Sequence, residues 1–295
     1  MKTITARGRE SRRRLRWGML MGGAFLAGLL AMGVLLLLPG QGKREQGPAS
    51  SFSPPATHST PGPTPAGQVP QARLAIVLDD LGYEPSLDAE WLKIPEKATV
   101  AILPFGPSSR KVAESARARG WTVILHIPME PESPVSDRTE RFRIRRGMDS
   151  EEIENLIQRM TDNLPQATGA SNHMGSAATA DPVTMAAVAS AVRKRGFFLL
   201  DSMTTPRSVL LDAARNAGVP AARRDVSIDG SVSSEEMRRQ WEQAIAAAKE
   251  KGAGIFICHG GAETLRTLIE LLPRLREENV DAVTLDELFR AGKEA

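Results

Sequence analysis

The chain has 295 residues, of which 38 are Lys or Arg and 35 are Asp or Glu, so its formal net charge is +3. Residues 1–16 hold seven of the basic side chains and one acid, and residues 39–72 add about +1, which leaves about −4 for residues 73–295. An acidic domain lacks the clustered basic face that nucleic-acid binding requires, so we expect no nucleic-acid partner. The single cysteine, Cys258, excludes an internal disulfide and is expected to lie buried in a strand.

Residues 17–38 form an uncharged apolar run, WGMLMGGAFLAGLLAMGVLLLL. A helix of this length spans a hydrocarbon core of about 30 Å, and the basic arm before it predicts a cytoplasmic N-terminus. A signal peptide would have a shorter apolar core and a small-residue cleavage site, whereas this run ends in Leu-Leu-Leu-Leu-Pro-Gly. We therefore predict an uncleaved single-pass anchor in the inner membrane, with the C-terminal domain in the periplasm or another extracytoplasmic space.

Residues 39–72 are rich in Pro, Gly, Ser, Thr and Gln and have few large apolar side chains, which predicts a disordered linker. The residues that follow are numerous enough for one large domain with a hydrophobic core. The chain is therefore expected to comprise a basic cytoplasmic arm (1–16), a transmembrane anchor (17–38), a linker (39–72) and one folded domain (73–295).

Short apolar runs alternate with helical patterns in this domain. Strands are expected at RLAIVLDD (73–80), ATVAILPF (98–105), TVILHIPM (122–129), ATGASNHM (167–174), FFLLDS (197–202), ARRDVSID (222–229), GIFICHGG (254–261) and DAVTL (281–285). Helices are expected over 108–119, 150–163, 182–195, 206–217, 233–251 and 263–278. Apolar runs of this length are typical of strands buried on both faces. The alternation predicts an α/β fold with a parallel sheet of seven or eight strands, open or closed into a barrel.

Signals at the predicted helix ends support these assignments. Asp181 before Pro182 is typical of an N-cap followed by the first helical residue. Ser233 followed by Glu236 predicts a capping box. A glycine after a helix and before a strand predicts the left-handed residue that ends a helix, as at Gly120, Gly196 and Gly252.

Polar side chains collect at the carboxyl ends of the predicted strands, and all three histidines of the domain lie there. Because the carboxyl ends of parallel strands meet on one face, we expect these side chains to converge. Buried carboxylates and imidazoles are costly unless they are paired or bind a metal, and one carboxylate with two imidazoles is a common ligand set for Zn²⁺. The residues concerned are Asp79, Asp80, His126, Glu130, Asn172, His173, Asp201, Ser202, Asp225, Asp229 and His259.

Two other kinds of site are disfavoured. Gly260 and Gly261 precede a helix, but no Lys-Ser/Thr pair follows them, so a phosphate-binding loop of the P-loop type is not expected. Ser176 and Ser202 have histidines nearby but lack the glycine pattern of a nucleophile elbow, which argues against a serine hydrolase.

These motifs resemble those of the divergent polysaccharide deacetylase family, relatives of chitin and peptidoglycan deacetylases. The matching stretches occur in order along residues 73–289, as IVLDDLG (76–82), LHIPMEP (125–131), NHMGS (172–176), LLDSMTT (199–205), RRDVSID (223–229) and CHG (258–260). The resemblance implies a distorted (β/α) barrel of about seven parallel strands. It also implies metal-dependent removal of N- or O-acetyl groups from an envelope polysaccharide or peptidoglycan-like glycan, with Zn²⁺ as the expected metal.

The resemblance implies that Asp80 and His126 are metal ligands. Where the better-known deacetylases carry a second histidine four residues on, this chain has Glu130. His173, which the divergent family carries on the next strand, is the preferred third ligand because it ends its own strand and should point into the barrel mouth. Glu130 lies beyond Pro128 and would need a particular turn to reach the metal, so it is expected instead to orient a histidine.

The remaining expectations concern proton transfer. By resemblance Asp79 is the general base and His259 the general acid, and Asp201 is the third residue assigned to catalysis. Because Glu130 replaces the second histidine, one alternative is that the domain is a catalytically silent barrel that binds a glycan or an envelope protein partner. A weaker alternative is a hydrolase that acts on something other than acetyl groups.

Overall fold

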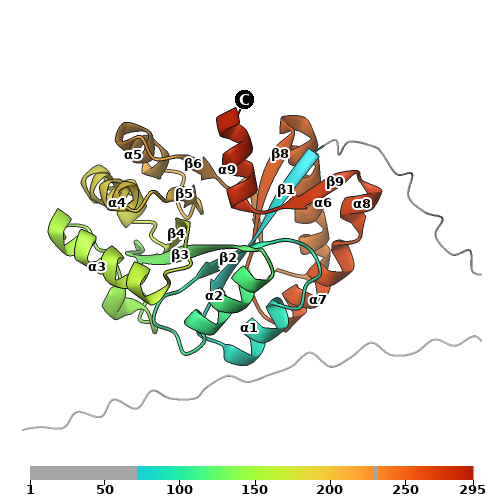
Figure 1. Cartoon of the computed structure of the whole chain (residues 1–295), viewed down its shortest axis with the longest axis horizontal. Coiled ribbons are helices and arrows are strands. Elements are labelled where there is room, and N and C mark those ends of the chain that lie inside the picture. Colours follow the sequence, from blue (N-terminus) through green and yellow to red (C-terminus); the bar gives the residue numbers. More distant parts are fainter. Residues whose placement is uncertain (1–71, 229–231, 295) are drawn as a thin grey trace, which may run out of the picture. The chain divides into compact units, whose positions relative to one another are not determined.

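The computed structural model describes residues 72–228 and 232–294 (Figure 1). The predicted arm, membrane anchor and linker lie outside these residues, apart from Ala72, and so does Asp229. Among the helices of the described residues, none has both the length and the apolar character that crossing a bilayer requires. The membrane anchor therefore stays a prediction from the sequence.

Strands and helices alternate along the described chain. The strands are β1 Ala72–Leu81, β2 Thr99–Ile102, β3 Thr122–Met129, β4 Gly169–Met174, β5 Phe198–Asp201, β6 Ala221–Arg223, β7 Val226–Ile228, β8 Ala253–Cys258 and β9 Val280–Val283. The helices are α1 Pro85–Trp91, α2 Ser109–Ala118, α3 Ser150–Asn163, α4 Pro182–Lys194, α5 Leu210–Ala217, α6 Ser234–Lys251, α7 Ala262–Leu271, α8 Arg274–Glu277 and α9 Leu285–Glu294. Two 3₁₀ turns lie at Glu140–Phe142 and Ala178–Ala180.

The strands form one parallel sheet in the order β6-β5-β4-β3-β2-β1-β8-β7, with β9 added to the first residues of β1. Strand β6 pairs with β5 and strand β7 pairs with β8, and only Arg224 and Asp225 separate β6 from β7. The chain itself thus links the two ends of the sheet, which is consistent with a distorted barrel. The single strand expected over 222–229 is instead two short strands: β6, which pairs with β5, and β7, which pairs with β8.

Alternate strand residues fill the interior of the barrel. Ala75 and Val77 of β1 and Ile257 of β8 belong to one buried cluster, against which Phe289 of α9 packs. The rings of Phe289 and Phe198 stack with their centroids 4.3 Å apart. The first turn of α9 also hydrogen-bonds to threonines at the amino ends of β2, β3 and β4. Helix α9 therefore packs against the amino end of the barrel, whereas the candidate residues lie at the carboxyl end.

The outward residues of the strands pack against the surrounding helices. Leu74, Ile76 and Leu78 of β1 belong to the larger buried cluster, which also contains residues of α2, α3, α4 and α6. Cys258 is fully buried at the end of β8, as predicted. Three tryptophans are buried in the same core and are not available on the surface for stacking on sugar rings: Trp91, Trp121 and Trp241.

Most helix boundaries agree with the sequence signals. The Asp181 side chain accepts a hydrogen bond from the Thr184 N–H, and Ser233 accepts one from Glu236. The helix expected over 263–278 is divided into α7 and α8 at Pro273, which has no N–H to continue the helical hydrogen bonds. Helix α5 begins at Leu210, four residues later than expected. Helices α1 and α9 were not predicted.

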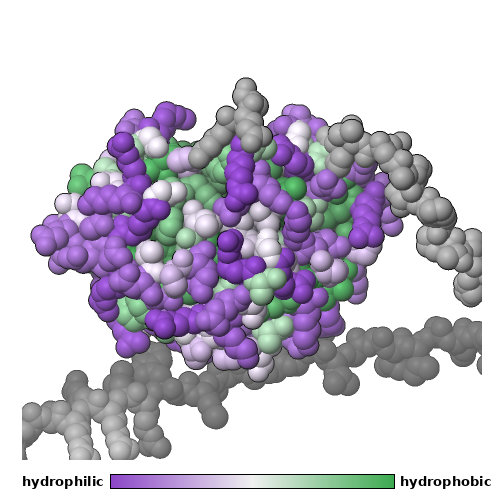
Figure 2. All heavy atoms as spheres, in the orientation of Figure 1, coloured by the Kyte–Doolittle hydropathy of each residue, from purple (hydrophilic) through white to green (hydrophobic). Residues whose placement is uncertain are grey.

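The face of the domain seen in Figure 1 is largely covered by hydrophilic side chains (Figure 2). Among the described residues, the large apolar side chains that are exposed are Val135 in the loop after β3, Val183 of α4 and Ile269 of α7, which belong to three different parts of the fold. Scattered apolar residues of this kind are normal on a protein surface and indicate no docking patch.

Candidate metal centre and active site

The carboxyl ends of the strands surround a cavity of about 430 Å³. Asp79 of β1, His126 of β3, His173 of β4 and His259 after β8 all line it. These residues continue the inward alternation of the interior cluster, because Val77, Ile124 and Ile257 lie two residues before three of them. The cavity is therefore the open mouth of the barrel, and the apolar cluster lies beneath it.

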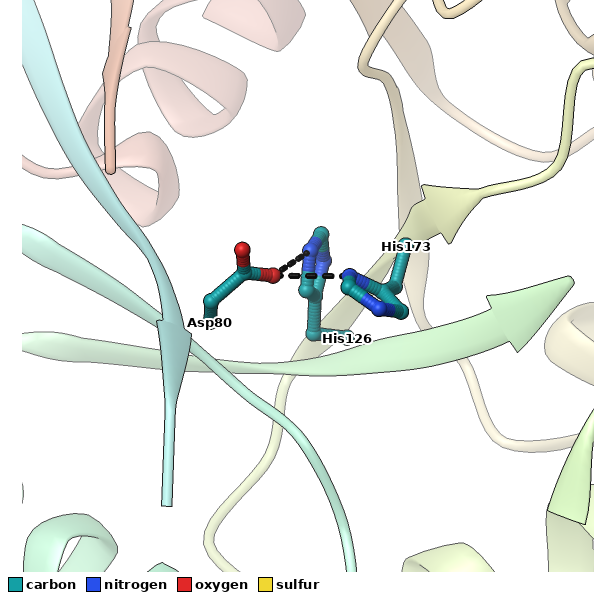
Figure 3. A group of neighbouring side chains, drawn as sticks. All are labelled: Asp80, His126 and His173. Atoms are coloured by element: carbon teal, nitrogen blue, oxygen red, sulfur yellow. Dashed lines mark ion pairs between the residues drawn. The ribbon is translucent and has the colours of Figure 1, made fainter. Parts of the chain in front are cut away.

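Asp80, His126 and His173 point toward one another from three different strands (Figure 3). Asp80 Oδ1 lies 3.1 Å from His126 Nε2 and 2.7 Å from His173 Nδ1. One donor atom from each residue lies within 4.8 Å of the other two. The strand pairing contributes to this closeness, because His126 of β3 is in register with Ser171 of β4 and His173 lies two residues farther along the same strand.

The backbone at Asp80 is bent out of regular strand geometry. Its φ is +66°, in the left-handed region that non-glycine residues seldom adopt, and the pairing of β1 with β2 shifts register at this point. Asp88 of α1 holds the following turn, since its Oδ2 accepts hydrogen bonds from the Gly82 N–H at 3.1 Å and from the Ser108 hydroxyl. A left-handed residue costs about 1–3 kcal/mol and persists where surrounding contacts fix it, often at functional sites.

The imidazole of His126 is buried and held by a serine. His126 Nδ1 lies 2.7 Å from Ser171 Oγ, and the opposite nitrogen faces Asp80. Burial lowers the pKa of His126 to about 4, although the nearby Asp80 carboxylate acts in the opposite direction. A neutral imidazole is the form that ligates metals, and a partner on its second nitrogen fixes which nitrogen is available.

The Asp80 carboxylate has the properties expected of a ligand. Burial alone would raise its pKa, but the two imidazoles outweigh burial and hold the pKa of Asp80 well below its usual range. Within the described residues its buried Oδ1 has no hydrogen-bonding partner of acceptable geometry, although two imidazole nitrogens lie within 3.1 Å. One oxygen and two nitrogens that face a common point fit a divalent cation such as Zn²⁺.

Asp79 lies beside this cluster, with its Oδ2 3.7 Å from His126 Nε2. Burial, and then the neighbouring charge of Asp80, raise the pKa of Asp79 well above its usual value, while Arg224 acts to lower it. His259 lies at the end of the adjacent strand, because Leu78 of β1 pairs in register with Cys258 of β8. Asp79 and His259 thus occupy corresponding positions on neighbouring strands at the cavity.

Three residues expected at the site do not line the cavity formed by the described residues: Glu130, Asp201 and Asp225. The Glu130 carboxylate accepts hydrogen bonds from Arg146, through the backbone N–H at 2.9 Å and Nε at 3.1 Å. Ser171, rather than Glu130, is the partner that orients His126. Asp201 is fully buried, and its Oδ1 accepts a hydrogen bond from the Met203 N–H at 2.8 Å.

Two further polar residues line the cavity: Asn172, which was expected among the converging strand-end residues, and Arg224, which was not. Asn172 joins β4 to the chain after β5, because it donates to the Met174 carbonyl and accepts from the Ser202 N–H. Arg224, between β6 and β7, donates to the carbonyls of Ser202 and Met203. Their positions beside predicted strand ends were visible in the sequence, but their contacts depend on which strands become neighbours.

The sequence matches the family of divergent polysaccharide deacetylases over residues 76–289, and the chain belongs to that family. The uncharacterized protein YibQ of Escherichia coli is 36% identical over 203 residues, which are 69% of this chain and 63% of that protein. An uncharacterized protein of Haemophilus influenzae is 34% identical over 223 residues, or 76% of this chain and 79% of that protein. The family indicates a carbohydrate deacetylase-like function.

A solved structure supports the fold. The crystal structure of an uncharacterized protein from Agrobacterium tumefaciens matches with a TM-score of 0.71 at 21% sequence identity. The match covers 76% of this chain and 92% of that one. The fold of the described domain is therefore one that an experimentally determined protein shares.

Proposed function

We propose that this protein removes N- or O-acetyl groups from an envelope polysaccharide or peptidoglycan-like glycan by metal-dependent hydrolysis. The observation that carries the proposal is the convergence of Asp80, His126 and His173 at the barrel mouth. Membership of a deacetylase family adds the reaction class. We also propose that residues 17–38 anchor the domain to the inner membrane on its periplasmic side.

Asp80 Oδ1, His126 Nε2 and His173 Nδ1 are the atoms that would hold the metal. A divalent ion there supplies Lewis-acid chemistry, because it polarises an acetyl carbonyl and lowers the pKa of bound water. Ser171 keeps His126 Nε2 directed at the centre by engaging Nδ1. The bend at Asp80 turns its carboxylate toward the imidazoles.

Asp79 is the proposed general base. It lies close enough to the ligands to accept a proton from the attacking water, and the positive charge of a metal would oppose the rise that burial causes in its pKa. Water adds to the acetyl carbon, and the C–N or C–O bond to the glycan then breaks. His259, at the neighbouring strand end, donates the proton that the departing amine or hydroxyl oxygen needs.

Recognition of the sugar would rest on polar contacts. No Phe, Tyr or Trp side chain of the described residues lines the cavity, which argues against stacking on such rings as the main source of affinity. The cavity walls instead carry serine, threonine, asparagine and arginine side chains together with two methionines. Hydrogen bonds to sugar hydroxyls and to the acetamido group are the interactions that such walls provide.

The proposal is tested by acetate release. The purified protein is stripped by mild chelation, reloaded with Zn²⁺ and incubated with N-acetylated and O-acetylated glycan fragments, and free acetate is measured. We expect acetate release that depends on the metal and is lost in an Asp79→Asn variant. Stoichiometric metal without release from either class of fragment would favour a silent glycan-binding barrel, and no bound metal would remove the proposal.

A further inference from the structure

The hydroxyl of Ser202 is an unused polar group in the wall of the cavity. Ser202 directly follows β5 and lines the barrel mouth, and only 8% of the residue is exposed. Its Oγ is buried and has no hydrogen-bond partner among the described residues. Burying a hydroxyl without a hydrogen-bond partner is unfavourable, so such groups are rare unless a bound molecule supplies the hydrogen bond.

The direction of this side chain follows from the strand. Phe198 and Leu200 of β5 belong to the interior cluster, and Ser202 is the next residue of the same alternation. Strand β5 is separated from β1 by β2, β3 and β4 on one side and by β6, β7 and β8 on the other. Ser202 therefore faces the cavity from the wall opposite Asp79 and Asp80.

The backbone of Ser202 is fixed on both sides. Its N–H donates to Asn172 Oδ1 at 2.9 Å, and its carbonyl accepts from Arg224 Nε. The next residue, Met203, has a left-handed φ of +52°, and its N–H is held by Asp201. Asn172, Arg224 and Asp201 thus hold the turn that positions the Ser202 side chain at the cavity wall.

Two other serines at this end of the barrel use their hydroxyls within the protein. Ser171 Oγ contacts His126, and Ser176 Oγ accepts from the Glu132 N–H at 2.9 Å. Ser202 also lacks a hydrogen bond to any histidine of the described residues, so no base activates it as a nucleophile.

We propose that Ser202 is a further catalytic residue, whose hydroxyl forms a hydrogen bond to the bound acetylated substrate from the wall opposite the metal ligands. The inference rests on the proposed function, because it requires the substrate to occupy this cavity. It adds a substrate contact on β5 to the metal ligands on β1, β3 and β4. In this role, the hydrogen bonds of Asn172 and Arg224 to the Ser202 backbone position the hydroxyl for the substrate.

The test compares Ser202→Ala with Ser176→Ala in the full chain loaded with Zn²⁺. Acetohydroxamate, a small acetyl compound that binds zinc, serves as the probe, and its Kd is measured by calorimetry. Zinc affinity and Tm are measured on the same samples. The control serine lies at the same end of the barrel, but its hydroxyl is paired and does not line the cavity of the described residues.

For Ser202→Ala we expect the Kd for acetohydroxamate to rise about tenfold, which corresponds to about 1.4 kcal/mol. Zinc affinity should stay within about twofold, and Tm should be unchanged or higher, because an unpaired buried hydroxyl is removed. Ser176→Ala should leave the Kd for the probe unchanged.

Equal Kd values for wild type and Ser202→Ala would overturn the inference, as would a zinc-loaded wild type that does not bind the probe. A fall in Tm with an unchanged Kd would show instead that Ser202 is structural. Absence of bound zinc would count against the proposed function, so the two failures are distinguishable.

Discussion

Replacing His173 and Glu130 in turn distinguishes the two candidates for the third metal ligand. His173 Nδ1 lies 2.7 Å from Asp80 Oδ1 and belongs to the cluster of candidate metal-ligand atoms. The Glu130 carboxylate instead accepts hydrogen bonds from Arg146. His173→Ala removes one of three protein donors. Since loss of a residue that merely supports a ligand costs about 10- to 100-fold in metal affinity, loss of the ligand itself should cost at least that much.

Glu130→Ala should affect the stability of the fold rather than metal binding. The ion pair between Glu130 and Arg146 is partly solvated, with side-chain exposures of 28% and 54%. Pairs of this kind contribute about 1 kcal/mol or less to the free energy of unfolding. We therefore expect a small loss of stability, while zinc affinity stays within about threefold of wild type because no metal ligand is touched.

The assay is a competitive zinc titration at neutral pH against a chromophoric chelator, with circular dichroism to check that each variant is folded. The two variants are compared in the same buffer with the same chelator. The reasoning is refuted if Glu130→Ala abolishes zinc binding and His173→Ala leaves affinity within about threefold. The loop carboxylate would then be the ligand.

Three further outcomes follow from the same geometry. Asp80→Asn and His126→Ala should each lower zinc affinity at least tenfold and keep the far-ultraviolet dichroism of wild type, and unchanged affinity in both would refute the metal site. Ser171→Ala should weaken zinc binding about tenfold because it frees Nδ1 of the histidine, and the same loss in a matched Ser176→Ala variant would contradict that explanation. A reporter fused after Ala295 should be active only if it functions outside the cytoplasm, and activity of a cytoplasmic reporter there would mean that the basic arm was misinterpreted.

Much of the fold was predictable because β1, β2, β3, β5 and β8 are apolar runs buried on both faces. Strand β3 and helix α3 have the predicted bounds, and the regular spacing of the other runs gave the parallel α/β order. The break between β6 and β7 at residues 224–225 was not predictable. It arises because Asp225 Oδ2 accepts from the Ile255 N–H and Asp225 Oδ1 pairs with Lys251, which are contacts between distant segments.

The candidate site was predictable to the extent that it depends on strand ends. Asp80, His126 and His173 each lie at or near the carboxyl end of a strand, and parallel strands bring such ends together. The partner of His126 depends on the register between β3 and β4, which aligns His126 with Ser171 and is not encoded in either strand alone.

The direction of Glu130 depends on a contact between distant parts of one loop. The Glu130 N–H donates to the Ile144 carbonyl, so the chain that brings Arg146 to the carboxylate lies alongside the end of β3. The burial of Asp201 could not be predicted from the sequence either, because an acid at a strand end gives the same sequence pattern whether its side chain faces the cavity or the core.

The most direct test of the central claim is anomalous diffraction at the zinc edge from crystals of the zinc-loaded protein. The account predicts one strong peak in the barrel mouth, with Asp80 Oδ1, His126 Nε2 and His173 Nδ1 each at about 2.0–2.2 Å from it. A peak bound by Glu130 instead of His173, or no peak in the mouth of a protein that binds zinc in solution, would contradict it.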